Sequence, residues 1–581
     1  MINKIKTETD PMGKVTQYDY DKNGNLNLLQ IADSAYGNIK REYKYDALNR
    51  LRWMKINDAL ALTNNYNTAG DLTGIVTPNG TYAYTYDENH RLKTAQEPGG
   101  YKLTNTYSTA SDKTNGMRIN LNETLGPINQ NTVYSFDSLQ RIAQVINPGG
   151  RATQFNFDEK GSIVRIKQGA MSIYQDYDDA ARLKSQTVTG NANLEISYGY
   201  NANGQVQSYT EKVGSTSVNQ TFAYDFAKRL TSWTKTGQSA VTYTYDKAGN
   251  LLNPHGHSYT VNNANEINGF TYDKAGNLRQ DNKYNYEWNG QGQLTTVKNK
   301  STGSVIASYT YHPEGLRKSK TTGGVTYNYH YDGDNLIRIT SNNATVYAFT
   351  WANGKPVSLT DSTGTSYYYV TNYRGDVVRI VDAGGNSVAD YSYDPWGIVT
   401  VGGSSAVKDQ PIRYASYVQD GETNLYYLQA RYYDPDNARF VSRDPHGGTL
   451  TNPLSQNVYA YGNGDPVNNV DPDGRMAGAL ALGGSIASGA IAVPASTVVL
   501  VGAAIVGTGY LSYLAYKNTH DWIINAQNNK TIRKKIKSLE EQIRAHEEKI
   551  RQDPNSRARN HWEKEIRTFK DQVDKLLKKL S

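Results

Sequence analysis

The chain has 581 residues, a length at which either several domains or a repeat architecture is expected. It contains no cysteine, which excludes a disulfide framework, a thiolate metal site and a cysteine nucleophile. Its formal net charge of +7 belongs mostly to the last 51 residues, and a basic tail of this kind supplies only nonspecific attraction to phosphate, so no specific nucleic-acid partner is predicted.

The N-terminal stretch MINKIKTETDPMG lacks the apolar run of a secretory signal peptide. Two explanations are open. Export uses a route that needs no such signal, or the chain is the C-terminal piece of a longer exported protein. We favour the second explanation.

A short aromatic motif recurs along most of the chain. The sequence reads YTYDKAGNLLN at 243–253 and FTYDKAGNLRQ at 270–280, and related copies begin at residues 18, 43, 84, 134, 155, 175, 198, 222, 286 and 329. Each copy alternates aromatic and polar residues, reaches an Asp or Asn, and continues through a turn to Leu, Ile or Val. This pattern predicts one β-hairpin per repeat, with the Asp hydrogen-bonded to the turn backbone.

These motifs resemble the YD repeats of the Rhs, wall-associated and teneurin-like family, and the resemblance covers roughly residues 1–475. It implies a mainly β fold in which hairpins form a spiral that closes into a hollow shell. In that family the shell holds a C-terminal polypeptide, commonly a toxin. We therefore assign residues 1–390 to a YD-repeat β-shell.

Residues 391–475 carry a longer signature, including YSYDPWG from 391 and LYYLQARYYDPDNARFVSRDPHGG from 425. From the residues alone, the Asp-Pro dipeptides at Asp434, Asp444 and Asp471 indicate recurring tight turns. The signature also resembles the Rhs repeat-associated core, which plugs one end of the shell.

In many members of the family, two aspartates of this core act as an aspartic-protease-like pair that cuts the chain. The matching residues are Asp444 and Asp471, and the implied cleavage site is Arg475 and Met476. One carboxyl group would activate water while the other protonates the leaving amine. The alternative is that this core is a structural plug that does not cleave.

Residues 476–516 contain no charged side chain, which is enough for two membrane passes that turn near Pro494. The alternative is an apolar segment buried in the shell. Residues 517–581 are basic, and their apolar residues step by three and four, which predicts an antiparallel, coiled-coil-like helical hairpin. We therefore expect an α-helical C-terminal region. It shows no catalytic or metal-binding pattern, and no cofactor is predicted.

The combined hypothesis is a polymorphic toxin of contact-dependent bacterial competition, in which the β-shell encapsulates and delivers a short, membrane-active C-terminal effector. The expected partners are the chain's own C-terminal module inside the shell, the membrane of a target cell, and an immunity protein. Secretion or association with the cell surface is expected. The alternative is a cell-surface adhesive repeat protein whose helical tail is an anchor or an oligomerisation element.

Overall fold

The computed structural model describes residues 4–110, 114–403, 405–444, 453–475 and 478–479. The chain divides into two compact units, Met1–Gly509 and Tyr510–Ser581, and all described residues belong to the first. This unit is mainly β, as predicted. Two large antiparallel sheets of 22 and 14 strands follow each other along the chain, and smaller sheets of four and two strands come after them.

In both large sheets each strand pairs with its neighbours in sequence. The first sheet contains β1 (Thr7–Thr9), β2 (Val15–Tyr20), β3 (Leu26–Ile31), β4 (Ile39–Tyr45), β5 (Leu51–Ile56), β6 (Ala59–Tyr66), β7 (Leu72–Thr77), β8 (Gly80–Tyr86), β9 (Leu92–Gln96), β10 (Lys102–Tyr107), β11 (Arg118–Leu125), β12 (Ile128–Phe136), β13 (Ile142–Ile146), β14 (Ala152–Phe157), β15 (Ile163–Gln168), β16 (Met171–Tyr177), β17 (Leu183–Val188), β18 (Leu194–Tyr200), β19 (Val206–Val213), β20 (Thr216–Tyr224), β21 (Leu230–Lys235) and β22 (Val241–Thr242).

The second sheet contains β23 (Thr271–Tyr272), β24 (Leu278–Gln280), β25 (Tyr284–Trp288), β26 (Leu294–Asn299), β27 (Val305–Tyr311), β28 (Arg317–Thr322), β29 (Val325–Asp332), β30 (Asn335–Ser341), β31 (Ala344–Ala352), β32 (Lys355–Asp361), β33 (Ser366–Thr371), β34 (Val377–Val381), β35 (Ser387–Tyr393) and β36 (Val399–Gly402). The small sheets contain β37 (Val418–Gln419), β38 (Tyr426–Leu428), β39 (Arg431–Asp434) and β40 (Arg439–Phe440), then β41 (Asn469–Val470) and β42 (Gly478–Ala479). Five short 3-10 helices are η1 (Pro254–Gly256), η2 (Ala406–Asp409), η3 (Tyr414–Ser416), η4 (Pro453–Gln456) and η5 (Gly462–Gly464).

The repeat aspartate organises each hairpin turn, as the sequence predicts. One carboxylate oxygen of Asp46 accepts hydrogen bonds from the backbone N–H groups of Leu48 and Arg50, and the other accepts one from the Arg50 side chain at 2.8 Å. The Arg50 guanidinium then lies 4.3 Å from the ring centre of Tyr66, in the next repeat. The same Asp–Arg pair recurs at Asp87, Asp137, Asp178 and Asp225. One turn therefore links two successive hairpins.

The second aromatic residue of each unit shapes the sheet. The strand register shifts at this residue, for example at Tyr20, Tyr45, Tyr66 and Tyr86. Such bulges bend a strand and increase its twist. Repeated in almost every hairpin, they give the long sheet a steady curvature.

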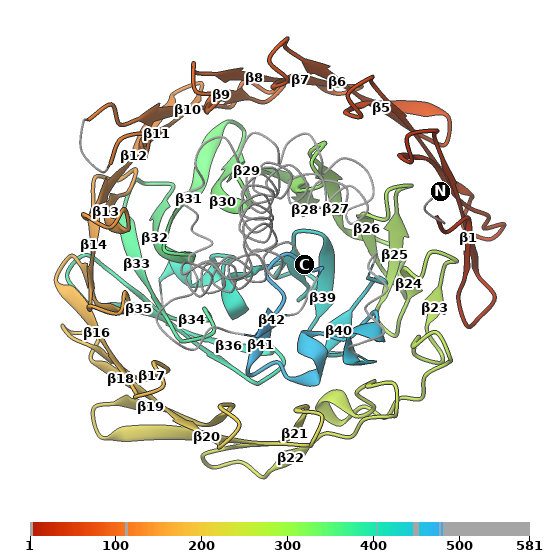
Figure 1. Cartoon of the computed structure of the whole chain (residues 1–581). Helices are drawn as coiled ribbons and strands as arrows, with labels where there is room; N and C mark the ends of the chain where they lie inside the picture. The colour runs from red at the N-terminus through yellow and green to blue at the C-terminus, as the bar shows by residue number, and fades with distance from the viewer. Residues whose placement is uncertain (1–3, 111–113, 404, 445–452, 476–477, 480–581) are drawn as a thin grey trace, which may run out of the picture. The chain divides into compact units, whose positions relative to one another are not determined.

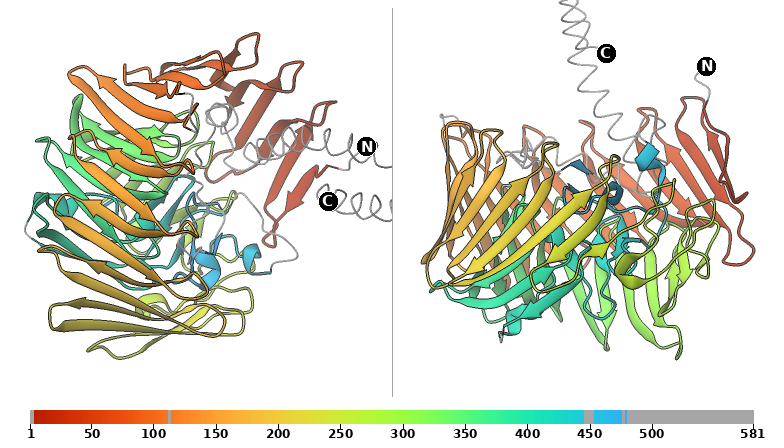
Figure 2. Two further views of the ribbon diagram at one scale, coloured as in Figure 1. Left: turned by 60° about the vertical axis from the view of Figure 1, so that its left-hand side comes forward. Right: turned by 90° about the horizontal axis from the view of Figure 1, so that it is seen from below.

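This curvature makes the two large sheets into successive turns of one spiral. In Figure 1 the first sheet forms an outer ring and the second sheet an inner ring, and Figure 2 shows the two as stacked rows of strands. Hydrogen bonds between the turns join residues 252, 230, 214 and 175 positions apart, in the pairs Lys14–Glu266, Tyr82–His312, Arg118–Asp332 and Tyr198–Tyr373. The decreasing separation shows that the spiral narrows along the chain.

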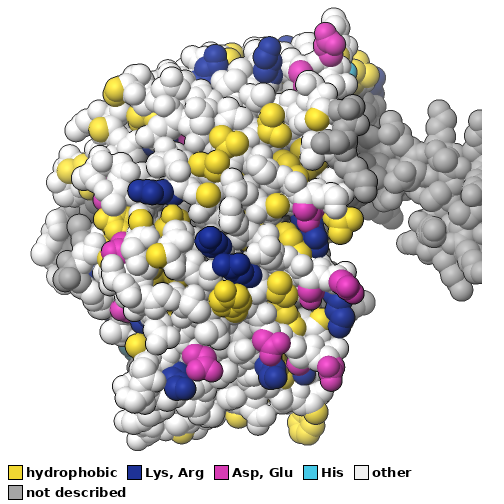
Figure 3. Space-filling model, turned by 90° about the vertical axis from the view of Figure 1, so that its left-hand side faces the viewer, with side chains coloured by type: hydrophobic (Ala, Val, Ile, Leu, Met, Phe, Trp, Pro, Cys, Tyr) yellow, Lys and Arg dark blue, Asp and Glu magenta, His cyan; other side chains and the backbone are white. Residues whose placement is uncertain are grey.

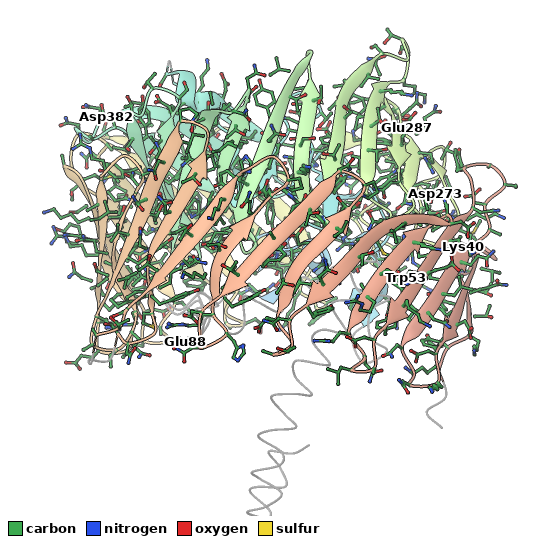
Figure 4. The ribbon with its side chains drawn as sticks, turned by 90° about the horizontal axis from the view of Figure 1, so that it is seen from above. Lys40, Trp53, Glu88, Asp273, Glu287 and Asp382 are labelled. Atoms are coloured by element: carbon green, nitrogen blue, oxygen red, sulfur yellow. The ribbon has the colours of Figure 1, made fainter. Side chains whose placement is uncertain are left out.

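A buried polar seam holds the two turns together. Arg338 of β30 is fully buried, and its Nε donates to Glu123 of β11 at 2.7 Å. His330 stacks on Tyr101, with 3.8 Å between ring centres, and its Nδ1 lies 3.2 Å from the carboxylate of Glu97. Figure 4 shows the strands of the first turn along one edge of this unit and those of the second turn along the other.

We use the name "plug" for the described residues 414–475, which lie inside the inner ring in Figure 1. The plug contacts the second sheet through Arg317, whose side chain has no exposed surface. The Arg317 guanidinium pairs with Asp420 at 2.7 Å and lies within 6 Å of four tyrosine rings, those of Tyr309, Tyr329, Tyr427 and Tyr432. Burial of these rings joins sheet and plug into one hydrophobic core.

The outer surface has mixed character. On the face shown in Figure 3, lysine, arginine, aspartate and glutamate side chains are scattered among uncharged atoms, and hydrophobic side chains form small groups. Among the described residues, no helix is long and apolar enough to span a membrane.

Two predicted regions lie almost entirely outside the described residues. Of the predicted apolar helical segment, 476–516, the structure describes only Gly478–Ala479 as secondary structure, and these residues form β42, a strand, in place of a helix. The predicted helical hairpin, 517–581, lies outside the described residues altogether. The predicted boundary at residue 390 falls within β35, and the second sheet continues to Gly402.

Candidate functional site

The plug brings together the two aspartates singled out in the sequence. Arg431, the first residue of β39, lies between them, and its Nη2 is 2.8 Å from Oδ2 of Asp444 and 3.0 Å from Oδ2 of Asp471. Because both oxygens contact the same nitrogen atom, their separation cannot exceed the sum of these two distances. One cation therefore bridges the two carboxylates and offsets their mutual repulsion.

Arg431 is held rigidly in this position. Its side chain is 3% exposed, and its guanidinium lies 3.5 Å from the ring centre of Phe440. Its Nη1 donates to the carbonyl oxygen of Val458 at 3.1 Å, and its Nε donates to the carbonyl oxygen of Gly474. Sequence analysis missed this residue. It stands in the quoted signature, but nothing in its spacing from either aspartate indicates contact.

Asp471 connects Arg431 to the candidate cleavage loop. Its side chain is 2% exposed, and its Oδ1 accepts a hydrogen bond from the backbone N–H of Arg475 at 2.9 Å. Its own backbone N–H donates to the hydroxyl of Tyr417 at 3.0 Å. The second aspartate, Asp444, is more open, with 13% of its side chain exposed. Water can therefore approach the pair from the side of Asp444.

The loop itself is the connection of a small hairpin. Val470 in β41 pairs with Gly478 in β42, and the intervening residues pass over the turn between β38 and β39. The backbone of Gly474 has a φ of 72°, and a Cβ atom there would approach the carbonyl oxygen of Leu428 to 2.4 Å. Only glycine fits this approach. Arg475 lies in this hairpin loop, whereas Met476 lies outside the described residues.

The geometry suits acid–base chemistry on a peptide. Two carboxyl groups lie together, one of them almost completely buried and bonded to the backbone of the candidate loop. A proton shared by Asp444 and Asp471 stays a prediction. Within the described part of the chain, no group of three or more His, Asp or Glu side chains is arranged to hold a metal ion.

A family model described as "Teneurin YD-shell" matches residues 8–189 and 163–467 of the chain. Among solved structures, the crystal structure of TcdB2-TccC3 without its hypervariable C-terminal region aligns with a TM-score of 0.55 and 16% identity, over 81% of this chain and 27% of that one. This likeness concerns the fold.

Curated relatives match shorter parts of the chain. The tRNA nuclease WapA of Bacillus subtilis is 53% identical over 110 residues, which are 19% of this chain and 5% of WapA. Double-stranded DNA deaminase toxin A of Burkholderia cenocepacia is 37% identical over 20% of this chain and 8% of the toxin. Toxin protein Tse5 of Pseudomonas aeruginosa is 39% identical over 14% of this chain and 6% of Tse5. The matches thus span less than a tenth of each of these relatives.

Proposed function

Because the chain belongs to the teneurin YD-shell family, we propose that it is the carrier part of a polymorphic toxin, with a spiral β-shell that encloses and delivers a C-terminal effector. The observation that carries this proposal is the course of the chain. After two turns of spiral wall it enters the ring of strands, and β41 and β42 lie inside the inner ring in Figure 1. The residues after β42 are therefore fed into the interior.

The names of the curated relatives support the same proposal. They include a tRNA nuclease, a DNA deaminase toxin and a toxin protein. We assign residues 1–390 to the shell, 391–475 to the plug-forming core, and 476–516 with 517–581 to the effector. The uncharged segment 476–516 favours a membrane-active effector, and an immunity protein would protect the producing cell. Secretion is expected for such a carrier.

Self-cleavage would release the effector within the shell. In this scheme Asp444 and Asp471 act on the peptide bond between Arg475 and Met476. One carboxylate takes a proton from water, which attacks the carbonyl carbon of Arg475, and the other carboxyl group protonates the leaving amine. Arg431 would hold both groups in place.

Intact-mass spectrometry of the purified chain tests the cleavage. The wild-type chain should give two fragments that meet near residue 475 or 476, whereas Asp444→Asn and Asp471→Asn should leave one full-length chain. Asp473→Asn is the matched control, because Asp473 also accepts a hydrogen bond from the Arg475 backbone but does not contact Arg431 in the described geometry. A wild-type chain that stays intact at neutral and mildly acidic pH would refute self-cleavage and leave a purely structural plug.

Growth experiments test the effector separately. Induction of the complete chain in bacteria without an immunity protein should arrest growth and depolarise the cell membrane, whereas a chain that ends at Arg475 should be tolerated. Growth arrest without depolarisation would indicate an effector that is not membrane-active. Unimpaired growth with both chains would favour the alternative of an adhesive surface protein.

A further inference from the structure

The wall has one interruption, where the chain passes from the first turn of the spiral to the second. The ladder of the first sheet ends at β22 and that of the second begins at β23, and no pairing joins these two strands in the described structure. We call residues 254–283 the crossing segment. In place of ladder hydrogen bonds, this segment relies on side-chain contacts with the plug.

These contacts converge on one turn of the plug, residues 434–438, which we call the plug turn. From the crossing segment, the hydroxyl of Tyr259 donates to Oδ1 of Asn437, and Nζ of Lys283 pairs with Oδ2 of Asp436. From the other direction, Arg439 at the end of the plug turn donates to the backbone carbonyl of Asn265. The plug turn and the crossing segment therefore hold each other in place.

His255 forms the central contact. Its Nε2 lies 3.0 Å from the carbonyl oxygen of Pro435 in the plug turn, and its Nδ1 lies 3.3 Å from Oδ2 of Asp394, in the turn between β35 and β36. Both neighbours are acceptors, whereas a neutral imidazole has only one N–H to donate. The doubly protonated ring matches both partners. Protonated His255 thus ties together the crossing segment, the second sheet and the plug turn.

The carboxyl groups around His255 respond to pH in the same direction. Burial, together with the nearby charge of Asp436, raises the pKa of Asp434 in the plug turn to about 7. Burial also raises the pKa of Asp394, although His255 opposes this shift. A carboxyl group whose pKa is raised by folding stabilises the fold most when it is protonated, so that its contribution is lost as the pH rises through the raised pKa. Loss of the His255 proton acts with the same sign.

We propose that the crossing segment and the plug turn form a latch that protons close, tight in mildly acidic solution and looser as the pH rises through neutrality. Acid therefore tightens this joint, and the change of charge falls in the range where histidine titrates. The Lys283–Asp436 ion pair persists throughout this range, so the latch loosens without being released. The tyrosines that face it, Tyr259 and Tyr286, stay neutral because burial raises the pKa of each hydroxyl.

Hydrogen exchange of the complete chain at pH 5.5 and pH 8.0 tests the latch, once each rate is divided by the intrinsic rate at that pH. Protection at 254–259 and 434–438 should fall roughly thirtyfold between the two conditions, the change that follows from moving the pKa of Asp434 from 3.8 to about 7. Strand β31, in the middle of the second sheet, should keep its protection. Equal protection of the latch at both pH values would overturn the proposal.

Two variants and a matched control assign the effect. His255→Asn removes the titrating ring but suits the backbone, because φ is 48° at this position and asparagine tolerates left-handed conformations. His90→Asn is the control, since His90 has a φ of 60° and lies 3.0 Å from Asp71 on a different turn. His255→Asn and Asp434→Asn should each reduce the pH dependence, and His90→Asn should keep it. A full pH dependence in the His255→Asn, Asp434→Asn double variant would overturn the proposal.

Discussion

Replacing Asp420 by asparagine should loosen the plug more than any change to a surface charge. Asp420 and Arg317 have no exposed side-chain surface, and their contact of 2.7 Å is supported by a second one, 3.1 Å, from Lys320 to Asp420. These two cations hold the pKa of Asp420 below its ordinary value against the effect of burial. The Asp420→Asn substitution removes this charge and leaves Arg317 buried without its counterion.

The expected cost is about 3–5 kcal/mol, the range for breaking a buried ion pair by removal of one partner. The tyrosine rings around Arg317 do not compensate, because they surround the guanidinium in the wild-type chain as well. Replacement of both partners by apolar residues, in the Arg317→Met, Asp420→Leu double variant, should recover part of the loss. Lys320 keeps Glu422 as a partner at 3.0 Å in that variant.

The absence of cysteine from the chain provides a direct assay. A single reporter, Val441→Cys, places a thiol in the plug core at a position that is 2% exposed, and this thiol reacts with a labelling reagent only when the plug opens. A cost of about 3–5 kcal/mol should speed labelling between roughly a hundredfold and several thousandfold. Asp58→Asn, which removes a mostly exposed partner of Lys40, should leave the rate unchanged. An acceleration below about tenfold in Asp420→Asn would refute the reasoning.

Three further changes test other parts of the molecule. Arg338→Met should leave Glu123 buried without its ion pair and lower the resistance of the spiral to proteolysis between its two turns, with a cost of about 3 kcal/mol, measurable as a lower urea midpoint of cleavage. Gly474→Ala should displace the candidate loop, because the new Cβ would meet the carbonyl oxygen of Leu428, and fragment formation on intact-mass spectrometry should slow. Burial raises the pKa of Asp465 to about 6, so the plug should lose stability as the pH rises from 4 through 6, and Asp465→Asn should abolish that loss in thermal unfolding followed at both pH values.

Local structure was accessible from the sequence because it depends on neighbours along the chain. Asp46, for example, bonds to residues two and four positions later, so its role could be predicted from the repeat itself. The contact of Arg50 with Tyr66 is also local, but it was missed because it crosses from one repeat to the next. Alternation of aromatic and polar residues was sufficient to predict the hairpins and the mainly β fold.

The candidate site was only partly accessible. A family resemblance pointed to Asp444 and Asp471, whereas the cation between them, Arg431, comes from a different strand and is brought there by the folding of the plug. The latch was inaccessible for the same reason. His255 meets Pro435 across 180 positions of sequence, and that distance depends on the radius of the spiral, which no single repeat encodes.

The narrowing of the spiral has a consequence for how such a chain can change in length. Each turn is in register with the one beneath it through specific side chains, and the offset between partners falls from 252 to 175 positions. Removal of one hairpin from the middle of the first turn would move every later partner out of step, including the buried Arg338–Glu123 pair. Removal of a hairpin from the outer end would leave all of these pairs aligned. Gain and loss of repeats should therefore be tolerated at the wide, N-terminal end of the spiral and rejected within it, so that the shell can vary in capacity while its narrow end stays constant.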